Sequence, residues 1–122
     1  MAKIIVIGGH PKGYSYPFHQ DTRSGKVLRR ILHTHGIDAT LLNLWNGQRE
    51  MDIGIVSQEK LSEISSYSGN GCKIVVVGKY MYDRLKKQIE PGTTLYYLPH
   101  PSARSKHYIE TLERGLVKLS KE

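Results

Sequence analysis

The sequence predicts an α/β fold in which helices cover both faces of a four-stranded parallel sheet, a three-layer α/β/α arrangement. Four short apolar runs are spaced along the chain, at residues 3–8, 40–45, 73–78 and 94–99. Their apolar residues are continuous rather than alternating, which is typical of strands buried on both faces. Each run is followed by a segment with helical periodicity, and this alternation of strands and helices favours parallel pairing.

Apolar side chains recur at helical spacing after the first two runs. Residues 24–35 place Leu28 and Ile31 on one helical face, and Gly36 is well placed to end this helix. Ser57 precedes the next helical segment and is a candidate N-cap, because its hydroxyl can accept a hydrogen bond from a free backbone amide. One helix is therefore expected between the first and second strands, and another between the second and third.

The two remaining helices show the same periodicity. Met81, Leu85 and Ile89 recur at i, i+4 and i+8 before a Pro-Gly pair ends the pattern. The final helix carries an apolar stripe made of Ile109, Leu112, Leu116 and Leu119. On the solvent faces of the helices we expect the basic side chains of Arg29, Arg30, Lys86 and Lys87.

The chain of 122 residues fits one domain that spans residues 1–122, and this length is enough to bury a core without metals or disulfides. Cys72 is the only cysteine, so neither an internal disulfide nor a cysteine-rich metal site can form. No apolar stretch approaches the roughly 20 residues of a membrane-spanning helix. We therefore expect a soluble, cytoplasmic protein with no membrane partner. No obligate protein partner is evident, so we expect a monomer.

The net charge of +7 favours a polyanionic partner such as DNA, because cations that neutralise phosphates release condensed counterions. Many small proteins are basic without binding nucleic acid, so charge alone leaves both interpretations open. Neither the dinucleotide pattern G-x-G-x-x-G nor the P-loop pattern G-x-x-x-x-G-K-[ST] is present. The histidines lack the spacing and the carboxylate neighbours of a metal site, so we expect no metal and no cofactor.

Three loops follow the carboxyl ends of predicted strands, at residues 8–25, 46–54 and 100–106. In an open α/β sheet this edge is where ligands bind, so the three loops are candidates for one composite site. The first loop contains Tyr14, Tyr16 and Phe18, which either stack on bases or hold the loop against the body of the protein.

The other loops also offer polar groups whose roles have two interpretations. Asn43 ends an apolar strand, and its amide can read the edge of a pyrimidine or bond to neighbouring backbone. His100 lies between two prolines that restrict its backbone. Ser102 and Ser105 follow it, and either can contact a ligand or cap the last helix.

Taken together, these loops resemble those of the uracil-DNA glycosylase superfamily. The matching elements, in chain order, are GGHP at 8–11, Phe18, LLN at 41–43 and HPSARS at 100–105. The resemblance spans nearly the whole chain and implies a short member with a uracil-DNA glycosylase-like fold. Members that hold an iron–sulfur cluster need four cysteines, so that branch is excluded.

The resemblance implies a set of roles at the base. Phe18 would stack on a flipped base, Asn43 would hydrogen-bond its Watson–Crick edge, and Gly9 would let the backbone approach it. His100 would donate to a base carbonyl oxygen as negative charge develops there, and His10 would position the attacking water. The catalytic residues implied are therefore His100 and His10.

The resemblance also implies contacts to DNA. Arg104 occupies the position of a wedge that enters the duplex, and Ser102 and Ser105 would hold phosphates. Lys106 and Lys12 lie in or beside the same loops and are further phosphate candidates.

Two positions depart from the pattern. His10 stands where many relatives carry Asp, Asn or Glu, and a neutral imidazole can orient water but cannot stabilise a cationic sugar. Ala103 replaces a frequent proline, which loosens the wedge loop.

We therefore expect a monofunctional DNA glycosylase that hydrolyses the N-glycosidic bond of uracil or a related base. Two alternatives stay open: a catalytically inactive DNA- or nucleotide-binding module of the same fold, and a hydrolase of free nucleosides or nucleotides.

Overall fold

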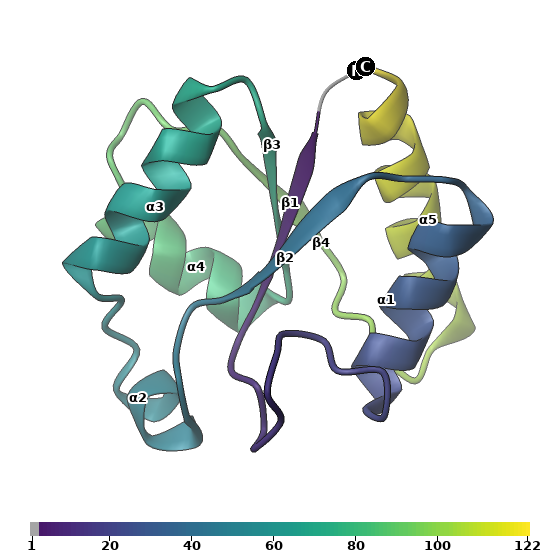
Figure 1. Ribbon diagram of the computed structural model, residues 1–122, viewed down its shortest axis with the longest axis horizontal. Helices are drawn as coiled ribbons and strands as arrows, with labels where there is room; N and C mark the ends of the chain where they lie inside the picture. The colour runs from purple at the N-terminus through teal and green to yellow at the C-terminus, as the bar shows by residue number, and fades with distance from the viewer. Residues whose placement is uncertain (1–2) are drawn as a thin grey trace.

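The computed structural model describes residues 3–122 and contains one four-stranded sheet whose strands are all parallel (Figure 1). The sheet order is β2-β1-β3-β4. The strands are β1 (Ile4–Gly8), β2 (Ala39–Asn43), β3 (Lys73–Val77) and β4 (Leu95–Leu98). Each lies within or next to an apolar run, so the parallel sheet expected from the sequence is confirmed.

Helices cover both faces of this sheet (Figure 1). One face is covered by α1 (Arg23–Thr34) and α5 (Lys106–Lys121). The other is covered by α3 (Gln58–Gly69) and α4 (Lys79–Gln88). The arrangement has the three layers that the sequence predicts.

The core consists of two apolar clusters separated by the sheet. Strands β1 and β3 are central, and their residues from Ile4 to Ile7 and from Ile74 to Val77 are fully buried. Alternate residues of these strands face opposite layers. Ile5 and Ile7 pack toward α3 and α4, while Ile4 and Val6 pack toward α1 and α5. Continuous apolar runs are therefore required at the two central strands.

Local capping signals fix the ends of several helices. Ser57 accepts a hydrogen bond from the backbone amide of Lys60 over 3.1 Å, as its N-cap position predicts. Gly36 follows α1 with a φ of 61°, a left-handed conformation that glycine adopts without strain.

One short helix, α2 (Gln48–Ile53), lies in the segment that the sequence analysis treats as a loop. It buries no residue, so it shows no apolar stripe by which periodicity would reveal it. Its signals are at its ends. The Glu50 carboxylate accepts the backbone amide of Asn46 over 3.0 Å, and Gly54 ends the helix with a φ of 79°.

Within residues 3–122, no helix combines the length and the apolar character needed to cross a lipid bilayer.

Candidate functional site

A cavity of about 330 Å³ opens at the carboxyl edge of the sheet. Its lining residues come from the loop after β1, the start of α1, the end of β2, the helices α2 and α4 and the loop after β4. His10, Phe18, Asn43 and His100 all line it, so four side chains that are distant in sequence meet in one space.

His100 follows β4, and its ring has a defined tautomer. Its Nδ1 accepts the backbone amide of Ser102 over 3.1 Å and lies 2.7 Å from the Ser102 hydroxyl. Because a backbone amide can only donate, Nδ1 carries no hydrogen and the neutral ring bears its hydrogen on Nε2. Burial, followed by repulsion from the Lys12 ammonium, lowers the pKa of His100 to about 4. The imidazole is therefore neutral near pH 7 and offers an N–H donor.

Phe18 forms the aromatic wall of the cavity. Only 8% of its surface is exposed, and its ring centroid lies 6.4 Å from that of His100. The ring packs on the backbone of Gly8, where an added Cβ would lie 2.6 Å from the Phe18 Cζ atom. The φ of Phe18 is 51°, a left-handed conformation that is strained for a bulky residue and is often found at binding sites.

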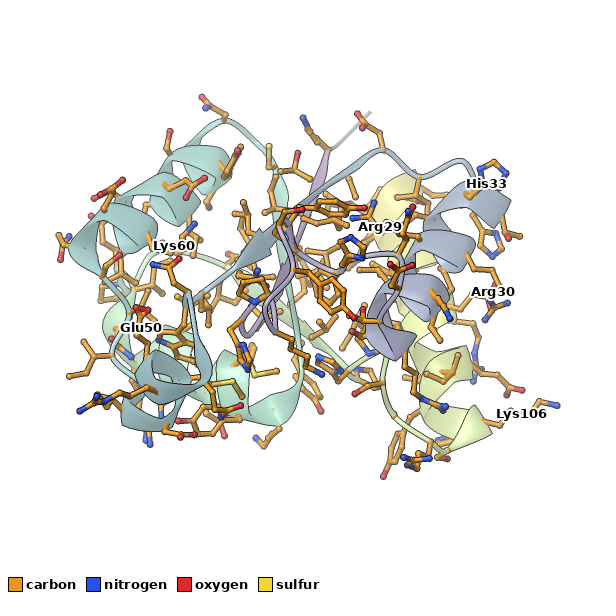
Figure 2. The ribbon with its side chains drawn as sticks, turned by 60° about the horizontal axis from the view of Figure 1, so that its bottom comes forward. Arg29, Arg30, His33, Glu50, Lys60 and Lys106 are labelled. Carbon is orange, nitrogen blue, oxygen red and sulfur yellow. The ribbon has the colours of Figure 1, made fainter. Side chains whose placement is uncertain are left out.

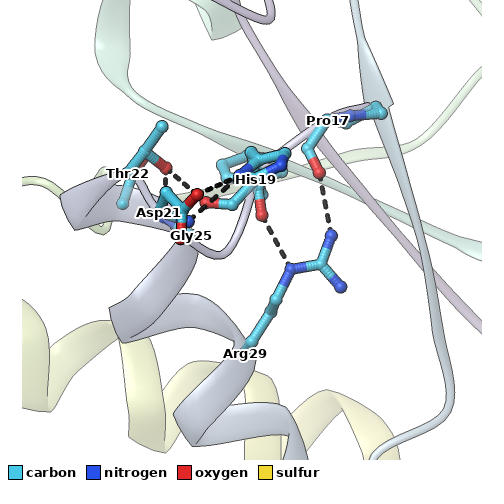
Figure 3. Close-up of polar contacts among 8 residues, drawn as sticks. Pro17, His19, Asp21, Thr22, Gly25 and Arg29 are labelled. Carbon is cyan, nitrogen blue, oxygen red and sulfur yellow. Dashed lines mark hydrogen bonds and ion pairs between the residues drawn. The ribbon is translucent and has the colours of Figure 1, made fainter. Parts of the chain in front are cut away.

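Arg29 holds this strained segment in place (Figure 3). Its Nε donates to the Phe18 carbonyl over 2.7 Å, and its Nη2 donates to the Pro17 carbonyl over 3.0 Å. The expectation that Arg29 lies on a solvent face of α1 is therefore wrong, because the loop supplies carbonyl acceptors beside the helix. Figure 2 shows the contrast, since Arg30 and Lys106 extend outward while Arg29 lies nearer the sheet.

The start of α1 anchors the rest of the loop (Figure 3). The Thr22 hydroxyl donates to the His19 carbonyl over 2.7 Å and accepts the Gly25 amide over 2.9 Å. Gly25 is buried against the His19 and Phe18 carbonyls, so closely that no Cβ fits there. This glycine lets the loop approach the helix and fixes the position of Phe18.

Asn43 is the last residue of β2 and pairs in register with Gly8. Its side chain lines the cavity and is half-buried. Among residues 3–122, no hydrogen bond of the Asn43 amide group is formed within the protein. The alternative that neighbouring backbone satisfies this side chain is therefore not what the structure shows, and the amide is available to a ligand.

Both ring nitrogens of His10 have partners. Nδ1 accepts the backbone amide of Lys12 over 3.2 Å, and Nε2 lies 3.0 Å from the Gln48 Oε1 atom. Because Nδ1 accepts, the neutral ring donates from Nε2 to Gln48. The Gln48 amide nitrogen donates in turn to Asp52 over 2.8 Å. The ring of His10 is thus oriented, and its one basic lone pair, on Nδ1, is occupied by the Lys12 amide.

Sequence reasoning missed several residues that line the cavity. Gln48 and Met51 lie on α2, and the Met51 sulfur would lie 3.1 Å from a Cβ added at Gly9. Met81 on α4 and both Thr22 and Ser24 complete the lining. Gln48 and Met51 were detectable only through the end signals of α2, and Met81 belongs to an apolar helical stripe that is typical of core residues.

The residues expected to contact DNA do not all border the cavity. Arg104, Ser105 and Lys106 are exposed, and none of them is among its lining residues. Ser105 is the N-cap residue of α5, yet within the described chain its side chain makes no capping hydrogen bond. Lys12 lines the cavity with a φ of 54°.

Ser102 also lines the cavity, but its hydroxyl is engaged with His100. To donate to a phosphate, the Ser102 hydroxyl would have to turn its hydrogen away from the Nδ1 atom of His100. The expected phosphate role of Ser102 therefore stays a prediction. Arg23, on the facing end of α1, donates to the Ser102 and Ala103 carbonyls over 3.3 and 3.4 Å and ties the two loops together.

No aspartate or glutamate is among the described residues that line the cavity. Asp21 belongs to the first loop, but its side chain is 68% exposed and its carboxylate lies 3.8 Å from Nδ1 of His19. Within residues 3–122, no group of three or more His, Cys, Asp or Glu side chains is arranged to hold a metal ion. The cavity thus offers donors, an amide and an aromatic wall, without negative charge.

Comparison with known protein families and with curated proteins gives no match to this chain.

Proposed function

We propose that this protein is a monofunctional DNA glycosylase, which flips uracil or a related base out of DNA and hydrolyses its N-glycosidic bond with water. The observation that carries the proposal is the meeting of Phe18, Asn43 and His100 in one cavity. An aromatic wall binds the face of a base, and an unoccupied amide binds its polar edge. These are the roles that the resemblance to uracil-DNA glycosylases implies.

The leaving base needs a hydrogen-bond donor. As the bond between the sugar C1′ and the base nitrogen breaks, its electron pair leaves with the base, and negative charge collects on a carbonyl oxygen. The Nε2–H of neutral His100 donates to that oxygen. Its orientation is set in advance by Ser102, so little reorganisation is needed during the reaction.

Water completes the hydrolysis. The sugar becomes oxocarbenium-like, water adds to C1′, and the proton that water loses passes to solvent or to the departed base. Both nitrogens of His10 are engaged, so the ring can position this water only when Gln48 releases Nε2, and we assign it no removal of a proton. With no carboxylate among the described residues that line the cavity, the phosphates of DNA supply the negative charge near the sugar.

The surrounding cations hold the nucleic acid. Arg104 is the proposed wedge, and Ser105, Lys106 and Lys12 are the proposed phosphate contacts. Flipping a base costs a few kcal/mol, which the wedge and the phosphate contacts offset.

Base release from uracil-containing single-stranded and duplex oligonucleotides tests the proposal. We expect His100→Ala to lower the rate by about 10²- to 10³-fold, as for the loss of one transition-state donor. Asn43→Ala should weaken base recognition, whereas His33→Ala, at an exposed position on α1, is the matched control. Activity that survives both cavity substitutions would refute the site assignment.

A catalytically inactive binding module is the second candidate, and it is favoured by the absence of a carboxylate among the described lining residues and by the engaged nitrogens of His10. Such a module would bind DNA with a strong dependence on salt. A mass-spectrometric screen of bases released from oligonucleotides with different modified bases separates the two candidates. Binding without release of any base would support the module.

A further inference from the structure

Three aromatic rings of the first loop form a stack beside the cavity. The His19 ring lies between those of Tyr14 and Tyr16, with centroid distances of 4.4 and 4.5 Å and an angle of 27° between the planes of each pair. No direct pairing of the two tyrosine rings occurs within residues 3–122, so they occupy opposite faces of the imidazole.

The two ends of this stack differ. The guanidinium of Arg29 lies 5.2 Å from the centroid of the Tyr16 ring and closes that end. At the other end, no further ring or cation lies over Tyr14 among the described residues. The two tyrosines are exposed to similar extents, 39% for Tyr14 and 38% for Tyr16, so the ends differ in the cation over Tyr16 and not in exposure. The outer face of Tyr14 is therefore the one left without an aromatic or cationic partner.

The stack is fixed next to the proposed base site. His19 lines the same cavity as its chain neighbour Phe18, and the Arg29 and Thr22 hydrogen bonds hold the backbone between them. Positive charge lies nearby, because Lys12 lines the same cavity as His19 and the Arg29 guanidinium lies over Tyr16. A rigid aromatic face beside cationic groups is the arrangement with which proteins bind single-stranded nucleic acid.

We propose that Tyr14, His19 and Tyr16 form a stacking platform for an unpaired base next to the flipped base in a single DNA strand. The inference rests on the proposed function for the flipped base, and it adds a preference for single-stranded substrate. In a duplex the neighbouring base stays paired and stacked within the helix, so the open face of Tyr14 contributes nothing there.

Binding of an unmodified single-stranded oligonucleotide, followed by fluorescence anisotropy at fixed salt, tests this platform without requiring base release. We expect Tyr14→Ala to weaken binding by roughly five- to a hundredfold, the loss typical of one stacked base. Tyr14→Phe keeps the ring and should bind like the wild type. Tyr97→Ala, at an exposed tyrosine of the edge strand β4, is the matched control and should also leave binding unchanged.

Unfolding midpoints of all variants show whether the loop change alters stability, and the Tyr14→Phe result separates loss of the ring from loss of the fold. Three results would overturn the platform: equal binding by Tyr14→Ala and wild type, an equal loss in Tyr97→Ala, or an equal loss on duplex and single strand. If Tyr14→Ala weakens single-strand binding while no base is released from any substrate, the platform stands and the glycosylase proposal fails.

Discussion

The backbone amide of Ser102 donates to Nδ1 of His100, across 3.1 Å between the two nitrogens and only two residues along the chain. The Ser102 hydroxyl lies 2.7 Å from the same atom. The loop after β4 thus sets the tautomer of its own histidine and directs the Nε2 hydrogen away from Ser102. The hydroxyl and the amide can be separated by mutation, because only the hydroxyl belongs to the side chain.

Ser102→Ala should lower kcat for base release by about fivefold, since one hydrogen bond of about 1 kcal/mol that orients the ring is lost while the backbone amide remains. A positioning role predicts an unchanged Kd for DNA, whereas a phosphate contact predicts weaker DNA binding. Single-turnover rates and binding isotherms of the variant distinguish the two roles. Ser105→Ala, at a proposed phosphate contact that does not touch His100, is the contrast and should weaken DNA binding while leaving the single-turnover rate unchanged.

The free energy of unfolding should depend on pH because the burial of His100 disfavours its protonation. Its pKa is about 4 in the folded protein and 6.5 ordinarily, so the unfolded chain binds the proton more readily between these values. The stability is fully present above pH 6.5 and is lost as the pH falls toward 4, by an amount on the order of 3 kcal/mol. Urea unfolding at both ends of this window should show a smaller change in His100→Gln. An identical change in both proteins would contradict the assignment.

Gly25→Ala should destabilise the fold by about 2 kcal/mol or more, because the new methyl group meets the His19 and Phe18 carbonyls. Gly69→Ala, on the open surface of α3, meets no atom within 4 Å and should stabilise by about 0.5 to 1 kcal/mol. Thermal or denaturant unfolding of the pair measures both effects. Equal effects in the two variants would show that the loop is not held against α1 in solution.

His10→Asp should raise the rate of base release by roughly tenfold, because a carboxylate at this wall adds about 1 to 2 kcal/mol of attraction for a cationic sugar. His10→Asn has similar size and no charge, so it is the control. The rate gain should appear only with the aspartate and should disappear when the carboxylate is protonated at low pH. A rate gain shared by both variants would show that the loss of the imidazole ring, and not the added negative charge, is responsible.

The sequence by itself determined the layers of the fold. Continuous apolar runs mark β1 and β3, which are buried on both faces, and helical periodicity with caps such as Ser57 marks the ends of the covering helices. These signals are local, because burial and capping act over a few neighbouring residues. The edge of the sheet that carries the cavity follows from the parallel order, since all the loops after the strands meet there.

Only the tertiary structure decided which groups in that cavity are free and which are engaged. His10 meets Gln48 across 38 positions of sequence, and Arg29 turns from its expected solvent face to two loop carbonyls. The amide of Asn43 has no such partner in the described chain. No local pattern records these outcomes, because hydrogen-bond partners distant in sequence are chosen by how the helices and loops pack.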